Sequence, residues 1–341
     1  MATSGSTKIT IFSWLSLEFI WQQNSQSVEN NSTTIGWKMN LISGNGTLTR
    51  SDRKWTVVID GVTYTGTVKV NIGANSTQTL ASGTAAVSHS DDGTKTFSYS
   101  FSQEFKLTLN NGNYMGTYSG AGSGTLEPIA RASQPSLVTW PDTTQNVGNF
   151  GVEFAIHMNR KASTFTHTVR YEYGSRKGTI ATGVGTGTTW AVPLDFMNDI
   201  PNATSGSGRI YVDTYSGTKL IGTKYTGFTA TVPSTVKPTC SLTLEDITGV
   251  DDIYGSPVQR LSKIKITVNT TPAYSSPIAS YAVSANGVNY NAATATTTEL
   301  KTSGSSQVTA TVKDQRGRSG SASYTMNVHT AAPQVAGCSP L

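Results

Sequence analysis

Apolar residues recur at every second position in many short stretches of this chain, and almost nowhere at the spacing of a helix. The alternation is clear in residues 35–41, 97–101 and 165–171. A period of two places alternate side chains on one face of an extended strand. The pattern therefore predicts strands that are buried on one face. Only residues 193–200, which end before Pro201, favour a short helix.

The composition agrees with strands and tight turns. Charged residues make up 13% of the chain, which is about half of the usual share. Their place is taken by Thr, which suits half-buried strands, and by Ser, Gly and Asn, which suit turns. The chain has 341 residues, enough for two or three domains of about 100 to 150 residues each. We therefore predict an all-β protein made of tandem β-sandwich domains.

Prolines mark two candidate linkers, residues 128–135 and 232–238. After the second linker, predicted strands recur every eight to twelve residues or so, which is typical of an immunoglobulin-like sandwich. Asn286-Gly287 in this segment, like Asp60-Gly61 and Asp92-Gly93 in the first, predicts the tip of a hairpin. The expected segments are an N-terminal, jelly-roll-like β-sandwich (1–128), a second β-sandwich (129–234), an Ig-like β-sandwich (235–330) and a C-terminal tail (331–341).

Charge and hydropathy argue against two classes of partner. The net charge of +5 is spread along the chain, whereas nucleic-acid binders more often concentrate basic residues in a patch. No stretch of about 18 apolar residues exists that could span a bilayer. The N-terminus lacks the basic and apolar regions of a signal peptide. We therefore expect no nucleic-acid partner, no membrane and synthesis in a cytoplasm.

Two cysteines, Cys240 and Cys338, are too few for a disulfide framework. They lie at opposite ends of the last segment, so a bridge between them and two unpaired thiols are both open. Two unpaired thiols fit a protein that folds in a reducing cytoplasm.

Three groups of residues resemble proteins of siphophages. Residues 87–97 (VSHSDDGTKTF) resemble the His-x-x-Asp-Gly-x-Lys-x-Phe turn of many phage minor tail proteins. Residues 128–133 (PIARAS) resemble the IPRAS junction that follows this turn, with Ala130 at the usual Pro. Residues 254–319 are similar to the Ig-like repeat of siphophage tail proteins of unknown function from Gram-positive hosts. Their closing Asp-Gln-Arg-Gly-Arg (314–318) stands where the family usually has Asp-Ser-Arg-Gly-Arg.

The resemblance implies a virion component at or near the tail tip or baseplate, often linked to host contact, with no known catalytic residues. We therefore expect a non-enzymatic structural protein located in the virion. It would form a homo-oligomer and assemble with other virion proteins. Two further hypotheses stay open. One is a module that binds host cell-wall polysaccharide, and the other is an enzyme that acts on such a polysaccharide.

The titratable residues predict neither a catalytic site nor a cofactor or metal site. A tetrahedral zinc site needs four close ligands, but the histidines are scattered at His89, His157, His167 and His329. His89 is better interpreted as part of the turn before Asp91. The strongest acidic cluster is Glu245-Asp246 with Asp251-Asp252, which could be a calcium site or an ordinary acidic loop.

Two pairs of residues are candidates for contacts with other molecules. Trp14 and Trp21 flank an unusually apolar run and could stack on sugars, or could be buried in the core or against another subunit. Arg316 and Arg318 enclose Gly317 between two alternating runs and predict a charged hairpin loop. That loop could serve solubility alone, or could form a salt bridge to a carboxylate of another subunit.

Overall fold

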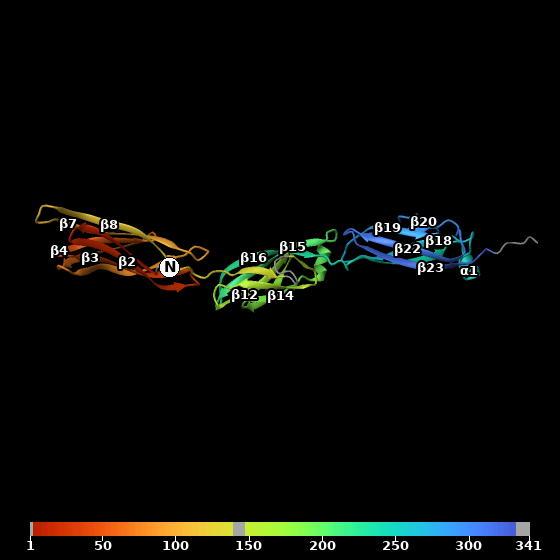
Figure 1. Ribbon diagram of the computed structural model, residues 1–341, viewed down its shortest axis with the longest axis horizontal. Helices are drawn as coiled ribbons and strands as arrows, with labels where there is room; N and C mark the ends of the chain where they lie inside the picture. The colour runs from red at the N-terminus through yellow and green to blue at the C-terminus, as the bar shows by residue number, and fades with distance from the viewer. Residues whose placement is uncertain (1–2, 139–146, 332–341) are drawn as a thin grey trace, which may run out of the picture.

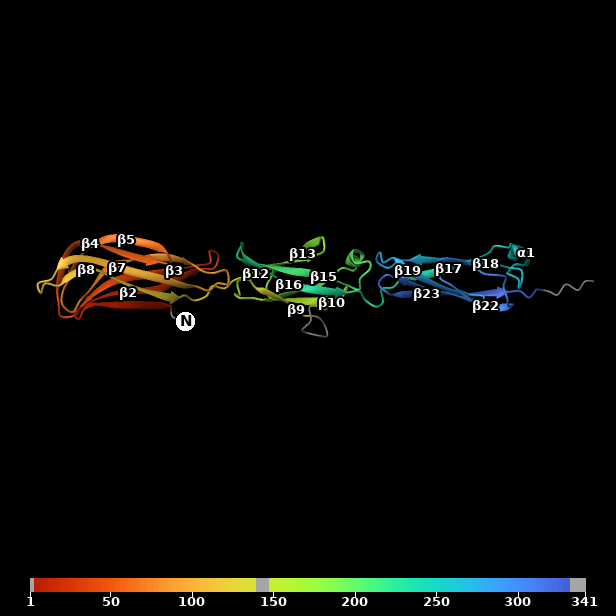
Figure 2. The same cartoon turned by 90° about the horizontal axis from the view of Figure 1, so that it is seen from above.

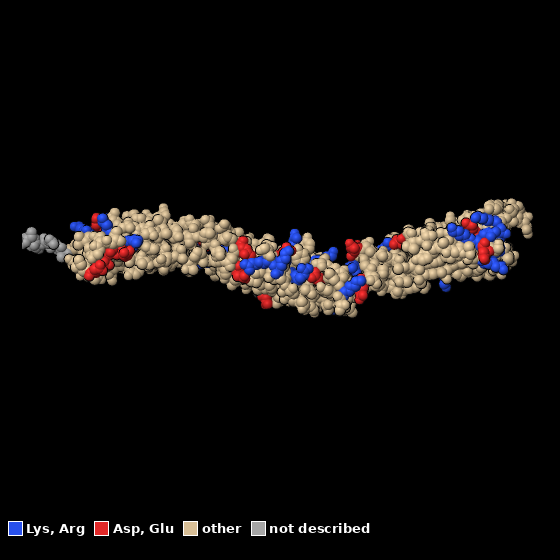
Figure 3. Space-filling view, turned by 180° about the vertical axis from the view of Figure 1, so that it is seen from behind, with Lys and Arg blue, Asp and Glu red and all other residues tan. Residues whose placement is uncertain are grey.

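The computed structural model describes residues 3–138 and 147–331. Three β-sandwiches follow one another end to end and form an elongated molecule (Figures 1 and 2). Each of the three predicted segments contains one pair of sheets and one buried core. On the face shown in Figure 3, charged side chains gather at the outer ends of the first and third domains and on the middle domain, with uncharged stretches between these groups.

The first domain packs two four-stranded sheets face to face. One sheet has the order β1-β2-β3-β6 and the other β5-β4-β7-β8. The strands are β1 (Ser4–Phe12), β2 (Leu15–Ser27), β3 (Ser32–Ser43), β4 (Leu48–Ile59), β5 (Val62–Ile72), β6 (Thr77–Ser88), β7 (Thr96–Thr108) and β8 (Tyr114–Thr125).

This strand order corrects the jelly-roll part of the prediction. A jelly roll contains two Greek keys, whereas β1, β2 and β3 pair side by side as a meander. The two connections of this meander are short, and short connections join neighbouring antiparallel strands.

Aromatic rings fill the space between the two sheets of the first domain. Phe19 stacks on Tyr99 and Phe101, with ring centroids 4.8 and 5.5 Å apart. On β8, the strand paired with the one that carries Phe101, Gly120 leaves room for the Phe101 ring, since a Cβ at this position would lie 2.5 Å from the ring. The alternation that predicted these strands therefore corresponds to one continuous aromatic core.

The Asp92-Gly93 turn is not the hairpin tip that was expected. The preceding strand β6 and the following strand β7 belong to different sheets, so the chain crosses the sandwich here. Gly93 does have a positive φ of 85°, which glycine adopts without strain. The other two predicted hairpin tips are confirmed, because both residues of Asp60-Gly61 and of Asn286-Gly287 have positive φ between paired strands.

The second domain packs a five-stranded sheet, β10-β16-β15-β12-β13, on a three-stranded sheet, β14-β11-β9. The expected short helix is a 3-10 helix, η1 (Leu194–Asp199). The strands are β9 (Gln134–Val138), β10 (Val147–Asn149), β11 (Glu153–Asn159), β12 (Phe165–Tyr173), β13 (Arg176–Val184), β14 (Gly187–Ala191), β15 (Ser205–Ser216) and β16 (Lys219–Thr231).

The third domain is Ig-like, with seven strands in sheets of three and four, β17-β18-β21 and β20-β19-β22-β23. A short helix, α1 (Val250–Tyr254), lies at its far end (Figure 1). The strands are β17 (Thr239–Asp246), β18 (Ile264–Thr271), β19 (Ile278–Ala285), β20 (Val288–Tyr290), β21 (Thr294–Thr296), β22 (Gly304–Asp314) and β23 (Ser319–Val328). Across all the residues that the structure describes, no helix has the length and apolarity to cross a membrane.

Candidate functional site

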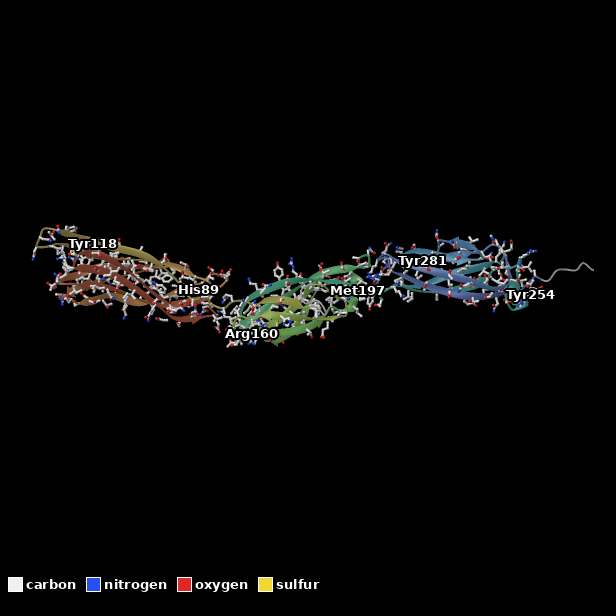
Figure 4. All side chains as sticks on the ribbon, viewed as in Figure 1. His89, Tyr118, Arg160, Met197, Tyr254 and Tyr281 are labelled. Atoms are coloured by element: carbon white, nitrogen blue, oxygen red, sulfur yellow. The ribbon has the colours of Figure 1, made fainter. Side chains whose placement is uncertain are left out.

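The two junctions between domains bring together the residue groups that resemble siphophage proteins. His89 lies at the end of the first domain that faces the second, and Met197 lies at the opposite end of the second domain (Figure 4). Residues 89–97 and 128–133 meet at the first junction, and residues 314–318 lie at the second. We therefore consider the junctions the candidate functional site of this protein.

At the first junction, the crossing loop after β6 holds the linker. The Ile129 amide donates to the Gly93 carbonyl at 2.9 Å. A Cβ on Gly93 would lie 1.9 Å from the Ile129 carbonyl oxygen, so only glycine fits here. His89 supports the loop from beneath. Its Nδ1 donates to the Gly93 carbonyl at 2.8 Å, and its Nε2 lies 2.7 Å from Thr33 Oγ1. The interpretation of His89 as part of this turn is thus confirmed.

Arg131 connects the first domain to the second. One guanidinium nitrogen donates to the Val28 carbonyl of the first domain at 2.7 Å, and another donates to the Ile221 carbonyl of the second at 2.6 Å. Two residues further on, the Ser133 amide donates to Thr214 Oγ1 at 3.0 Å, and Ser133 is fully buried. The linker is therefore fixed to both domains by hydrogen bonds, and it does not behave as a free tether.

Arg316 closes the second junction in the same manner, and more completely. Its guanidinium donates to the carbonyls of Met197 and Ile200 in the second domain at 2.6 and 3.1 Å. It also donates to the carbonyls of Ala273 and Tyr274 in the third domain at 2.9 and 3.0 Å. The side chain is 6% exposed. Hydrogen bonds from a charged donor are typically stronger than neutral ones, so this group is well suited to hold two domains together.

Other residues complete the second junction. The Tyr274 side chain of the third domain packs against the core of the second, and Ser275 Oγ donates to Asn198 Oδ1 across the junction at 2.9 Å. Tyr274 and Ser275 both have positive φ, 44° and 59°, which is uncommon for residues other than glycine. Burial lowers the pKa of the Arg316 guanidinium, but guanidinium groups stay charged in proteins.

These contacts correct the expectation for the 316–318 loop. It is not an exposed loop at a free end of a sandwich, because it lies between two domains of the same chain. Arg316 is buried, and its donors are occupied by backbone carbonyls, so it is not free to pair with a carboxylate of another subunit. Arg318 is half-buried and makes a weaker contact of the same kind, donating to the Val232 carbonyl at 3.3 Å.

The two tryptophans differ from each other. Trp21 is 3% exposed and packs edge-on against Phe97 at 5.0 Å, so it belongs to the core and cannot stack on a sugar. Trp14 is half-buried at the far end of the first domain, stacked on Phe12 at 6.2 Å. A Cβ on Gly46 would lie 2.3 Å from the Trp14 ring, so the ring also covers backbone. Of the alternatives for this pair, burial in the core is therefore correct for Trp21, and the two rings do not form a common platform for sugars.

The structure does not assemble a metal site from the acidic residues. Glu245 pairs with Lys265 at 3.4 Å, and Asp246 accepts hydrogen bonds from the Thr248 amide and hydroxyl. Within residues 3–138 and 147–331, no group of three His, Cys, Asp or Glu side chains is placed to hold a metal ion. Cys240 is a free thiol whose pKa is raised by burial. Its suggested partner Cys338 lies outside the described residues.

Three junction residues were not recognised from the sequence as contacts between domains: Arg131, Met197 and Tyr274. Arg131 lies between two linker prolines, Pro128 and Pro135, and a basic residue inside a proline-bounded linker was the available signal. Met197 contributes through its backbone carbonyl and Tyr274 through a left-handed backbone. Neither property is visible in residue identity alone.

The second domain contains an ion pair between a half-exposed arginine, Arg170, and a buried carboxylate, Asp213, that predicts a pH dependence. Arg170 donates to both carboxylate oxygens of Asp213 at 2.6 and 2.9 Å, and Thr223 Oγ1 donates to the same carboxylate. The Arg170 hydrogen bonds hold the pKa of Asp213 below its ordinary value. A carboxyl group with a lowered folded pKa stabilises the fold above its unfolded pKa, and this contribution is lost as the pH falls through the folded value.

We therefore expect the free energy of unfolding of the second domain to fall below about pH 4, and to fall less steeply in Asp213→Asn. Urea unfolding followed by hydrogen exchange of β12 and β15 peptides, at several pH values down to about pH 2, measures this difference. Glu153→Gln, at an exposed carboxyl of the same domain, is the control. Parallel pH curves for wild type and Asp213→Asn would contradict the expectation.

Comparison with known proteins gives one family. A family model described as "Siphovirus protein of unknown function (DUF859)" matches residues 14–329. No curated protein matches the chain.

Several solved structures are similar to this chain at low sequence identity. Fibronectin(III)-like modules of Clostridium thermocellum CbhA are 13% identical, with 61% of this chain and 100% of that chain covered and a TM-score of 0.25. A 1.5-MDa bacterial ice-binding adhesin is 15% identical, with 89% and 93% covered and a TM-score of 0.30. Cadherin domains 3–6 of Protocadherin Gamma B2 are 10% identical, with 97% and 92% covered and a TM-score of 0.31. These scores are too low to support an inference about function.

Proposed function

The chain belongs to the siphovirus family of proteins of unknown function, and from that premise we propose that it is a non-enzymatic structural protein of a bacteriophage virion. Its position would be the tail tip, the baseplate or another appendage on the particle surface, in contact with other virion proteins. Its specific task would be that of a stiff spacer, which keeps the far ends of the first and third domains at a constant separation.

The observation that carries this proposal is the pair of arginine-closed junctions. Tandem domains on free linkers move relative to one another by default. Here Arg131 and Arg316 each join two domains through hydrogen bonds to carbonyls on both sides, which are partly buried at Arg131 and include a buried one at Arg316. Such a chain resists bending at both junctions, which is the property required of a projecting structural element.

The use made of the other buried polar groups supports a non-enzymatic role. His89 and His167 each hydrogen-bond to a backbone carbonyl and to a hydroxyl. Asp213 is bound by Arg170 and Thr223. These side chains hold loops and strands in place.

Assembly with other chains would also make use of sheet edges. Strand β8 (Tyr114–Thr125) is 12 residues long, lies at the edge of its sheet and contains neither a charge nor a proline. Edge strands of isolated proteins usually carry charged residues or prolines, which protect them against pairing with the strands of other chains. We therefore also propose that the protein forms a homo-oligomer. Light scattering at micromolar concentration tests this, and a clean monomer would contradict self-assembly.

Quantitative mass spectrometry of gradient-purified particles tests the proposed function. Peptides of this protein should band with the particles at a constant ratio to the other virion proteins, through repeated gradients and after a high-salt wash. Peptides found only in the soluble lysate would overturn the proposal and would favour a free accessory protein.

A further inference from the structure

The outward face of the second domain carries an ordered row of rings and guanidinium groups. Arg170 lies 5.5 Å from the centre of the Tyr211 ring, and the centres of the Tyr211 and Tyr225 rings are 5.6 Å apart. Arg209 lies 5.0 Å from the centre of the Tyr225 ring. The row crosses β12, β15 and β16 in adjacent register. We call Arg170, Tyr211, Tyr225 and Arg209 the Tyr-Arg row.

Hydrogen bonds hold most of the row in place from its sides. The Tyr211 hydroxyl donates to Glu172 at 3.0 Å, and Lys177 pairs with Glu172 at 3.2 Å. Asp213 binds the Arg170 guanidinium through two oxygens. The row is therefore ordered before any ligand arrives, which reduces the entropy that binding would cost.

The row is open to solvent and has free space beside it. Tyr225 is 53% exposed. Next to it, Gly227 lies opposite Arg209 on the neighbouring strand, and a Cβ on Gly227 would have no atom closer than 3.9 Å. Further along the same two strands, Ser207 and Thr229 add outward hydroxyls 3.4 Å apart. Rings, open backbone and hydroxyls thus succeed one another along β15 and β16.

The chemistry of this face fits a saccharide better than a protein. Outward neighbours of the Tyr-Arg row are the charged residues Glu172, Lys177 and Asp213 together with Thr, Ser and one Gly, whereas the centre of a stable protein interface is apolar. A pyranose ring presents C–H groups on its face, which pack on an aromatic ring, and hydroxyls at its rim, which hydrogen-bond to polar side chains.

The charge of this face selects among saccharides. Arg170 pairs with Asp213 and Lys177 pairs with Glu172, and Glu172 also lies opposite Arg209 on the neighbouring strand and attracts it. Three cationic side chains, Arg170, Lys177 and Arg209, thus share two carboxylates, and the excess positive charge of this face favours an anionic ligand.

We propose that the Tyr-Arg row on β12, β15 and β16 is a binding site for an anionic polysaccharide built of pyranose rings. A sugar ring stacks on Tyr225 over the space beside Gly227, and a carboxylate or phosphate group on the chain accepts hydrogen bonds from Arg209. This site is distinct from the tryptophans Trp14 and Trp21, and it does not depend on where the protein lies in a virion.

The test is an array of defined pyranose oligosaccharides, with anionic and neutral members of equal length, followed by calorimetric titration of the tightest ligand. The full-length protein should retain anionic members above their neutral counterparts. Tyr225→Ala and Arg209→Ala should each weaken binding about tenfold or more, and Tyr225→Phe should bind as the wild type does. Tyr324→Ala, which removes a tyrosine of similar exposure (49%) from the third domain, should have no effect.

Several outcomes would overturn the proposal. The first is that the protein binds no oligosaccharide on the array. The second is that Tyr225→Ala binds the tightest ligand as well as the wild type does. If the protein bound polyglutamate as tightly as the anionic oligosaccharides, the row would attract negative charge alone and would not recognise a sugar. Binding to bacterial cell walls that is lost on protease treatment, and retained after the polysaccharide is removed, would assign the row to a protein partner. Because all these measurements use purified protein, their failure is separate from failure of the virion assignment.

Discussion

Replacing Arg316 by alanine is expected to release the third domain from the second while both remain folded. The substitution leaves four carbonyls of the junction without their donor. Removing one partner of a buried, charged hydrogen-bonded contact typically weakens the association of the two surfaces by about 2–5 kcal/mol. A loss of this size is enough to populate arrangements in which the third domain is no longer docked on the second. The effect falls on the junction because every side-chain hydrogen bond that Arg316 donates ends on a backbone carbonyl at this junction.

Spin labels on Thr179 and Ser321, one exposed position in each domain, measure this directly, with Cys240 and Cys338 replaced by serine. The distance distribution between the labels should be narrow in the parent protein and broad in Arg316→Ala. Arg318→Ala is the matched control, since it removes an arginine of the same loop that makes one long hydrogen bond. Equally narrow distributions for all three proteins would show that Arg316 does not hold the junction.

Replacing Gly93 by alanine is expected to destabilise the first domain and to displace the linker that follows it. Gly93 and Gly61 both have φ of 85°, so alanine at either position carries the backbone cost of about 1–2 kcal/mol. At Gly93 alone, the added Cβ would also lie 1.9 Å from the Ile129 carbonyl oxygen, whereas nothing lies within 4 Å at Gly61. Overpacking of this kind adds about 1–3 kcal/mol.

Gly61→Ala therefore serves as the control that isolates the steric clash. Urea-dependent hydrogen exchange of β7 and β8 peptides reports the free energy of unfolding of the first domain within the full chain. We expect a loss of about 2–5 kcal/mol for Gly93→Ala and about 1–2 kcal/mol for Gly61→Ala. Equal losses would mean that the loop shifts freely and does not hold the linker.

The strands could be predicted from the sequence because burial on one face leaves a period of two. The interpretation works best where a strand has one apolar face, as in β3, β7, β12 and β19. Strand β13 (Arg176–Val184) was not recognised, because it is an edge strand without a buried alternation. The topology of the first domain was also beyond the sequence, since Asp92-Gly93 has the residues of a hairpin but crosses between sheets.

The candidate site was less predictable than the fold. The relevant stretches at 89–97, 128–133 and 314–318 were recognised through resemblance, but what they do follows from contacts between residues far apart in sequence. Arg316 meets Met197 119 positions away, and the acceptors are backbone carbonyls, which every residue possesses. The Tyr-Arg row depends in the same way on strand register, because Tyr211 and Tyr225 become neighbours only when β15 and β16 pair.

Because the molecule is long, the stiffness of the proposed spacer can be measured on particles. The longest strands of the three domains have 13, 13 and 11 residues, and at about 3.3 Å per residue three such domains end to end span on the order of 120 Å. A stiff spacer of this length separates the first domain from the third by a distance that electron microscopy resolves.

The most direct test is to image purified particles of the source phage with two Fab fragments, one against the first domain and one against the third. We expect both labels on the particle surface, at two different distances from the particle axis. The spread in their separation should be narrow in the wild type and broader in Arg316→Ala. Particles without either label would contradict the virion assignment. Labels at variable separation on wild-type particles would contradict the stiff spacer.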